Sequence, residues 1–211
     1  MEFHGFARRN AKYLWVLFYT SVALTLLSVP PEILLPFLKK NPTLVLLCLS
    51  AVIAFISYKN QRHLTCAKNT IDFQTAFHNS KELNKATTVF ADRICHMTSD
   101  EIRQLAHVKD RDDKLNKSAR ELLNSWERVA VAVKNDVYDE EMLFNTYASF
   151  LLSIWQTLGP YIAEKQKVNP KWYVEFQWLA LRWRIRKDAA LTKRQIRELK
   201  QAVKGLENLI E

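Results

Sequence analysis

Basic and aromatic side chains that could bind an anion are concentrated near the C-terminal end of the sequence. Between positions 182 and 204, arginine and lysine recur every few residues, and only Asp188 and Glu198 oppose them. Arginine forks can hold a phosphorylated ligand, and each basic residue near an anionic bilayer adds about 1 kcal/mol of attraction. A third interpretation is the solvated face of two helices. The candidate ligand-binding or membrane-facing residues are Trp178, Arg182, Arg184, Arg186, Lys187, Arg194 and Arg197.

Histidine and cysteine residues offer a weaker candidate, for a metal. His63 and Cys66 are three positions apart and Cys95 and His96 are adjacent, but 28 residues separate Cys66 from Cys95. Zinc ligands usually come in compact pairs, so we expect neither a metal nor a cofactor. An odd, scattered set of three cysteines, the third being Cys48, is typical of a reducing compartment.

The sequence carries no pattern that predicts catalysis. It has no nucleophile elbow, no phosphate-cradling glycine loop and no H-E-x-x-H helix. The acidic run at positions 139–141 resembles a catalytic cluster, but a capping aspartate followed by two glutamates in a first helical turn explains it equally well. We therefore expect a protein that is not an enzyme and has no catalytic residues.

Two apolar runs, at residues 13–29 and 43–58, dominate the N-terminal part of the chain. Each has no formal charge and is close to the lower length limit for crossing a hydrocarbon core of about 30 Å as a helix. The prolines at positions 30, 31 and 42 prevent one continuous helix between them. The pattern predicts a transmembrane hairpin in residues 1–59, followed by a cytoplasmic helical domain in residues 60–211.

Two other interpretations of these runs have less support. A cleaved signal peptide would require a small-x-small site after Leu27, which is missing, and would leave the second run unexplained. A buried soluble hairpin would keep a polar face, whereas residues 44–56 are apolar all round.

Charged residues suggest the orientation of the hairpin. Basic residues flank its outer ends more than its connecting loop, which favours cytoplasmic location of both termini. Residues 1–68 carry eight Lys/Arg against two Asp/Glu, so much of the net charge of +9 flanks the runs, and we expect no binding to duplex nucleic acid. The residues concerned are Arg8, Arg9, Lys12, Lys39, Lys40, Lys59, Arg62 and Lys68.

The remaining sequence predicts an all-α domain, since three glycines in 211 residues leave little material for tight β-turns. We expect a helix from position 65 to about 95, interrupted near 78–80, and a short helix capped by Thr98 or Ser99. A solvated loop at 109–114 precedes a helix whose apolar stripe covers 119–133.

Later start and stop signals divide the C-terminal part into three helices. Asp139 is a capping residue for a helix whose stripe covers 143–162 and which Gly159-Pro160 should kink or end. Asn169-Pro170 is a second start signal, and its helix should place Trp172, Phe176, Leu179 and Trp183 on one buried face. A capping box at 192–195 then starts the last helix.

That last helix has an apolar series at steps of three and four residues. Two heptads are short for an independent coiled coil, so core packing is favoured over an intermolecular seam. We nevertheless expect a homo-oligomer, because two short uncharged spans bury little against each other in lipid. The series consists of Ile196, Leu199, Val203, Leu206 and Ile210.

Several aromatic and turn positions occur in the order found in a known family. They are the stretch 119–141, Ile154-Trp155, Pro160-Tyr161-Ile162, Asn169-Pro170, the stretch 176–180 and Trp183. With these residues the chain resembles, over about residues 66–187, the bacterial family catalogued as domain of unknown function 4760. The resemblance implies membrane spans joined to a cytoplasmic helical domain, here in a bacterial inner (plasma) membrane, and brings no catalytic residues.

Two functions are compatible with this sequence. The first is a membrane-anchored, non-enzymatic interaction or signalling protein, whose partners are the lipid bilayer, further copies of itself and a protein that the sequence does not identify. The alternative is a ligand-gated membrane effector, by analogy with the layout of small antiviral defence proteins. In that alternative, the cytoplasmic domain binds an anionic small molecule such as a nucleotide second messenger and perturbs the membrane.

Overall fold

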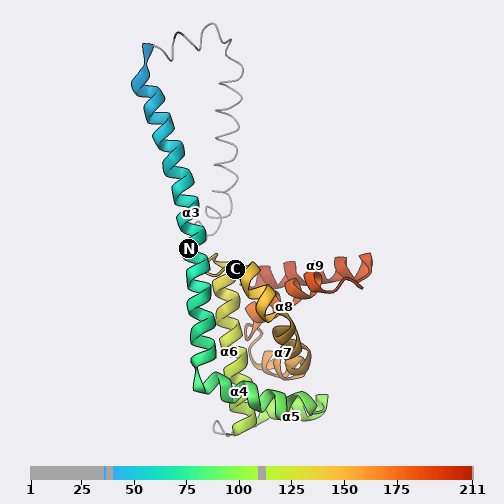
Figure 1. Cartoon of the computed structure of the whole chain (residues 1–211). Helices are drawn as coiled ribbons and strands as arrows, with labels where there is room; N and C mark the ends of the chain where they lie inside the picture. Colours follow the sequence, from blue (N-terminus) through green and yellow to red (C-terminus); the bar gives the residue numbers. More distant parts are fainter. Residues whose placement is uncertain (1–35, 37–39, 109–112, 211) are drawn as a thin grey trace. The chain divides into compact units, whose positions relative to one another are not determined.

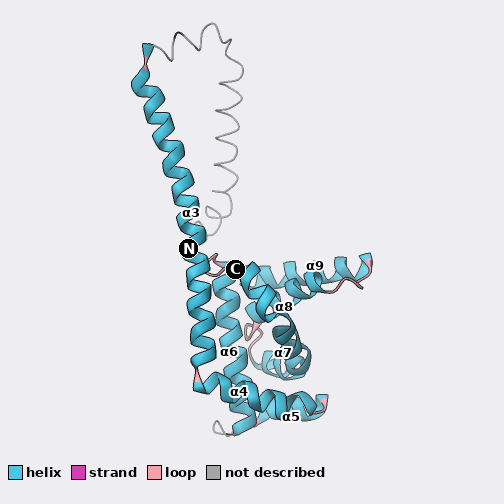
Figure 2. Cartoon of the chain, viewed as in Figure 1, coloured by secondary structure: helices cyan, strands magenta, loops and turns pink. Residues whose placement is uncertain are grey.

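The computed structural model describes residue 36 and residues 40–108 and 113–210, and these are helical without any strand (Figures 1 and 2). The predicted all-α class is confirmed. The chain divides into two units, Met1–Lys59 and Asn60–Glu211, which are described separately. The helices are α3 (Pro42–Asn79), α4 (Lys81–Asp92), the 3₁₀ helix η1 (Ile94–His96), α5 (Ser99–His107), α6 (Lys114–Lys134), α7 (Glu140–Val168), α8 (Val174–Lys187) and α9 (Lys193–Ile210).

The first unit contains the two apolar runs. The run at 13–29 lies outside the described residues, and the run at 43–58 belongs to the N-terminal part of α3. Among the described residues, no helix is both long and apolar enough to cross a membrane. The transmembrane hairpin therefore stays a prediction. The large apolar side chains of residues 46–58 are 40–70% exposed, namely Leu46, Leu47, Leu49, Val52, Ile53, Phe55, Ile56 and Tyr58.

Most helix starts in the second unit follow local capping signals in the sequence. Thr98 and Glu101 form a reciprocal capping box at α5, and Asp139 accepts a hydrogen bond from the Met142 N–H at α7. The Thr192–Gln195 box precedes α9 as predicted. Of the predicted loop at 109–114, Asp113 caps α6, Lys114 is the first residue of that helix, and residues 109–112 lie outside the described residues. The interruption near 78–80 is also confirmed, because α3 ends at Asn79 and Ser80 caps α4.

Aromatic rings from four helices meet at the centre of the second unit. Trp126 of α6 is fully buried, and its ring centroid lies 5.9 Å from Phe77 of α3 and 5.5 Å from Tyr147 of α7. The Trp183 ring of α8 is 6.4 Å away. Tilted and edge-to-face pairs at such distances contribute about 0.5–1.5 kcal/mol each beyond the area they bury.

The apolar stripes predicted from periodicity pack around this aromatic centre. All the predicted stripe positions of α6 are buried, as are most of those of α7. Helix α4 packs on α6, α5 on α7, and α8 on α6, α7 and α9. Val203, Leu206 and Ile210 of α9 pack against the core of their own chain, as the preference for core packing over an intermolecular seam predicts.

Gly159-Pro160 does not end α7, which continues to Val168. Proline in a helix interior costs about 3 kcal/mol, yet Leu158, Tyr161 and Ile162 on either side of it are fully buried. Burial of such side chains contributes about 1.5–3 kcal/mol each, so tertiary packing outweighs the local cost.

The predicted helix start at Asn169-Pro170 is wrong. Asn169 ends α7, its side chain accepts a hydrogen bond from the Lys171 N–H, and α8 begins only at Val174. Trp172 therefore lies outside the helix and is 41% exposed, whereas Phe176, Leu179 and Trp183 are buried as predicted. The N-cap of α8 is Tyr173, in the left-handed region at φ 60°, and it makes no side-chain cap of its own.

The second-unit part of α3 is held to the turn between α6 and α7 by a row of polar contacts. Asp136 has φ 55°; its carboxylate pairs with Arg62 at 2.9 Å, and its carbonyl accepts a hydrogen bond from the Cys66 thiol at 3.0 Å. The buried Thr70 hydroxyl accepts from the Asp139 N–H at 2.7 Å and donates to the Cys66 carbonyl. These contacts position the start of α7.

Replacing Thr70 with valine should lower the free energy of unfolding by about 1–3 kcal/mol. Thr70→Val keeps the shape of the side chain but removes the acceptor of the Asp139 N–H, and a buried donor without a partner carries that cost. Urea unfolding in mild detergent, followed by circular dichroism, measures the change. As a control, Thr88→Val removes an exposed hydroxyl bonded only within its own helix, and it should change stability by less than about 0.5 kcal/mol. Equal effects of both substitutions would contradict the assigned role.

Candidate functional site

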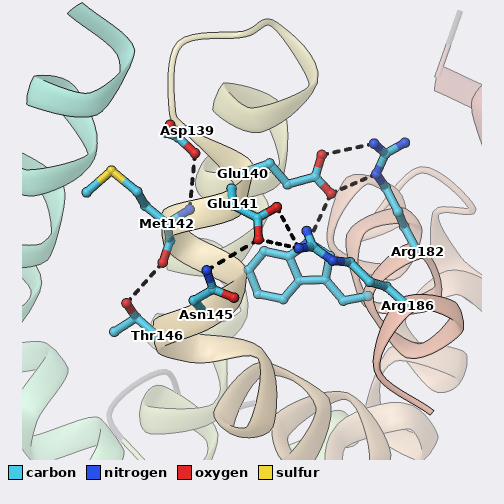
Figure 3. Close-up of polar contacts among 9 residues, drawn as sticks. Asp139, Glu140, Glu141, Met142, Asn145, Thr146, Arg182 and Arg186 are labelled. Atoms are coloured by element: carbon cyan, nitrogen blue, oxygen red, sulfur yellow. Dashed lines mark hydrogen bonds and ion pairs between the residues drawn. The ribbon is translucent and has the colours of Figure 1, made fainter. Parts of the chain in front are cut away.

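Two of the predicted basic residues of α8, Arg182 and Arg186, face the acidic first turn of α7. Arg182 forms a bidentate ion pair with Glu140, in which Nε donates to Oε1 at 2.7 Å and Nη2 donates to Oε2 at 3.0 Å (Figure 3). The Trp183 indole N–H also donates to Glu140, at 3.2 Å. Capping and the helix dipole are therefore only part of the role of Glu140, which also joins α7 to α8.

Arg186, one turn further along α8, contacts Glu141 through a single nitrogen. Its Nη2 lies 2.5 Å from both carboxylate oxygens of Glu141, and its guanidinium carbon lies 3.9 Å from the centroid of the Phe144 ring. Asn145 donates a further hydrogen bond to Glu141 (Figure 3). Glu140, Glu141, Arg182 and Arg186 line an open depression of about 480 Å³.

The other predicted site residues do not line this depression. The Arg184 guanidinium lies 5.6 Å from the Trp155 ring, and the Lys187 ammonium donates to the Ser149 hydroxyl. Trp178 is 4% exposed, donates from its indole N–H to Glu207 at 3.0 Å and stacks under Arg182 at 5.6 Å.

Arg194 and Arg197 lie on α9. Arg194 pairs with Glu198 at 2.8 Å, one turn along the same helix. The structure therefore brings Arg182, Arg186 and Trp178 close together and distributes the other four predicted residues around them.

The charge balance of the depression limits its chemistry. Two guanidinium groups face two carboxylates, so an incoming anion would have to displace a carboxylate from each arginine fork. The side chains are largely exposed, and ion pairs in such positions contribute about 0–1 kcal/mol each to stability. The arrangement suits helix pairing better than capture of a phosphorylated ligand.

Within the described ranges, no group of three His, Cys, Asp or Glu residues is placed to hold a metal ion. The cysteines that the sequence pairs with histidine are used in backbone contacts instead. Cys66 donates to the Asp136 carbonyl and Cys95 to the Ala91 carbonyl of its own turn.

A second cluster, which sequence reasoning missed, surrounds the N-terminus of α8. The Glu127 carboxylate of α6 accepts hydrogen bonds from the Phe176 N–H at 2.6 Å and from the Glu175 N–H at 3.4 Å. It thereby caps a helix that starts almost fifty residues later. In sequence, Glu127 is merely the polar neighbour of Trp126, and no spacing rule connects it to position 176.

Electrostatics at this cap are strongly perturbed. Burial raises the pKa of Glu127 to about 7, against the two backbone N–H groups that lower it, and the nearby Glu175 adds to the rise. Burial also raises the pKa of Glu175, whose carboxylate lies 3.6 Å from the Lys134 ammonium. The pKa of Tyr173 rises to about 12, chiefly through burial.

Two cations, Lys165 and Arg120, lie near the same end of α8. Burial and the charge of Arg120 lower the pKa of Lys165. The Lys165 ammonium lies 5.3 Å from the Tyr161 ring and 5.9 Å from the Trp172 ring. Groups with shifted pKa values mark candidate functional sites, and this cluster can bind or release a proton near neutral pH at the start of a helix.

Replacing Glu127 with glutamine should flatten the pH dependence of stability. The folded-state pKa of Glu127 is raised, so its contribution is fully present below pH 4.5 and is lost as the pH rises through about 7. Glu127→Gln keeps an acceptor for the α8 N–H groups but cannot ionise. Urea unfolding measured between these pH values should show a smaller loss of stability than in the unmodified chain.

Glu175 contributes a slope of the same sign, so the substituted chain should keep part of the dependence. The exposed Glu82→Gln on α4 makes the same chemical change away from the cluster and controls for the general effect of removing one carboxylate. An unchanged slope in the Glu127→Gln chain would show that this carboxyl does not titrate in the range.

Comparison with known sequences adds one relationship. A family described as a domain of unknown function (DUF4760) matches residues 44–183. The matched range includes the apolar part of α3 from residue 44 onward, the Glu127 cap and the Arg182 pair, and it stops before α9. It begins earlier than the resemblance seen from the residues alone. No curated protein and no solved structure matches the chain. Because the match covers well over half of its length, the chain belongs to the DUF4760 family.

Proposed function

We propose that this protein is a membrane-anchored, non-enzymatic interaction or signalling module of a bacterial inner membrane. In this proposal residues 13–29 and 43–58 form a transmembrane hairpin, both termini are cytoplasmic, and residues 60–211 present a helical surface to a partner protein. The observation that carries the proposal is the apolar segment of α3, residues 46–58, whose large side chains are exposed.

The distribution of these side chains argues for lipid as their environment. At about 100° per residue, they point to all sides of the helix rather than along one stripe. A docked protein would cover one side of a helix and leave a polar face elsewhere. Burial of each such side chain contributes about 1.5–3 kcal/mol, and a hydrocarbon phase can accept all of them at once.

The residues that follow the apolar segment suit a membrane boundary. Tyr58 is exposed, as is Lys59 after it, and the helix then continues with polar residues. Aromatic side chains at the headgroup level with basic residues beyond them are typical of the cytoplasmic end of a span. The homo-oligomer belongs to this proposal as well, with its contacts in the apolar segments, because three of the five apolar residues of the α9 series already pack against their own chain.

The alternative, a ligand-gated effector that binds an anionic nucleotide on α8, has less support. Its expected ligands Arg182 and Arg186 are paired with Glu140 and Glu141. A nucleotide would have to replace two carboxylates without gaining any enclosure, because the depression is open.

Glutamine substitution in the apolar segment should detach the protein from neutral bilayers. The collar variant Leu46→Gln/Leu47→Gln/Ile53→Gln removes three apolar side chains that are at least 63% exposed. We expect its affinity for phosphatidylcholine vesicles to fall at least about a hundredfold, as measured by vesicle flotation after dilution from detergent.

A matched control removes three exposed apolar side chains from the second unit. The variant Val131→Gln/Val168→Gln/Leu209→Gln changes apolarity in the same sense outside the segment, and it should float like the unmodified chain. Flotation of the collar variant at the unmodified level would refute the membrane anchor.

A further inference from the structure

Helix α9 carries a straight row of basic side chains along one flank. Their spacing of four, three and four residues places them within about 60° of one another around the helix, over a length of about 16 Å. All of them are exposed. We call this row the lysine stripe; it consists of Lys193, Arg197, Lys200 and Lys204.

The lysine stripe differs from Arg182 and Arg186 of α8, which are paired with carboxylates. In the part of the chain that the structure describes, no carboxylate lies within 4.0 Å of any of its four cations, whereas Arg182, Arg186 and Arg194 each have one. The acidic residues of α9 are already engaged, since Glu198 pairs with Arg194 and Glu207 accepts from Trp178.

The packing of α9 leaves this flank accessible. Helix α9 lies against α8 (Figure 1), it contains no fully buried residue, and Val203, Leu206 and Ile210 face the core. The apolar row is turned by about 110° from the lysine stripe around the helix. Both surfaces can therefore be occupied at the same time, the first by α8 and the second by a partner.

We infer that the lysine stripe is a contact surface for the anionic headgroups of a lipid bilayer. This inference rests on the proposed function, which brings a bilayer to the protein, and it adds which part of the second unit touches that bilayer. It moves the membrane-facing surface from Arg182 and Arg186 of α8, which are paired with carboxylates, to α9.

The chemistry of the stripe selects a charged surface over a single bound anion. Three of its four cations are lysines, which are point charges without the planar fork that recognises one phosphate. They are spread in a line rather than around a cavity, and a layer of mobile headgroups can match a line of charges. Helix α9 contains no aromatic residue, so it lacks the stacking platform that single-stranded nucleic acid uses.

The test uses the full chain with the collar substitutions as background, so that the apolar segment does not mask the charge effect. On phosphatidylcholine vesicles containing phosphatidylserine, this collar variant should keep a salt-sensitive affinity. Adding Lys193→Gln, Lys200→Gln and Lys204→Gln should lower that affinity about a hundredfold, and it should change nothing on vesicles without phosphatidylserine. Circular dichroism checks that the exposed substitutions leave the fold intact.

The control variant removes the same charge elsewhere. Lys81→Gln/Lys85→Gln/Lys117→Gln replaces three exposed lysines of α4 and α6, and it should leave the affinity for anionic vesicles within about twofold. An equal loss in both variants would mean that only net charge matters, and this would overturn the lysine stripe as a surface. Stripe-dependent binding to RNA but not to vesicles would overturn it in favour of nucleic acid.

The two proposals fail separately in this design. If the collar variant still floats on neutral vesicles, the anchor is wrong, and the stripe is then judged by the extra binding that phosphatidylserine causes. If the stripe substitutions leave that extra binding unchanged, the stripe is wrong whatever the collar variant does.

Discussion

The burial of Trp126 is the constraint on which the second unit depends. Its ring contacts aromatic rings of α3, α7 and α8, so one side chain of α6 fixes the spacing of three other helices. Truncating a buried tryptophan typically costs about 3–5 kcal/mol. Among the described residues its indole N–H has no acceptor. A buried donor without a partner costs about 1–3 kcal/mol, so aromatic packing outweighs that cost at this position. The next residue, Glu127, then fixes where α8 begins.

Local capping signals in the sequence predicted the helices well, whereas contacts between distant positions could not be read from the sequence. Thr98, Asp139 and Thr192 cap N–H groups three residues away, so their patterns are visible in sequence. The cap of α8 comes from Glu127, 49 residues before the N–H it accepts, and the local Asn169-Pro170 signal pointed to the wrong start. Pro160 does not end α7 for a related reason, because the residues on either side of it are buried against other helices.

In the candidate site, likewise, the composition could be read from the sequence but the contacts between side chains could not. The basic character of residues 182–204 was evident from the sequence, but the neutralisation of Arg182 by Glu140 joins positions 42 residues apart. Sequence reasoning therefore selected Arg182 and Arg186, which the structure pairs with carboxylates, together with Arg197, which belongs to the lysine stripe. The steps of four, three and four residues in that stripe were readable from the start. What the sequence lacked was the evidence that Glu198 and Glu207 are engaged elsewhere.

Helix α8 connects the two features that distinguish this domain. Its N-terminus is capped by a carboxyl whose pKa lies near neutrality, and its face supports α9 through the Trp178–Glu207 hydrogen bond. Loss of the Glu127 proton places a partly buried charge beside Glu175, on the carboxylate that accepts hydrogen bonds from N–H groups in the first turn of α8. Helix α9, which carries the lysine stripe, packs on this same helix. The family match ends at residue 183, so the capped helix is a feature of the matched domain, whereas the stripe belongs to the C-terminal helix that this chain places upon it.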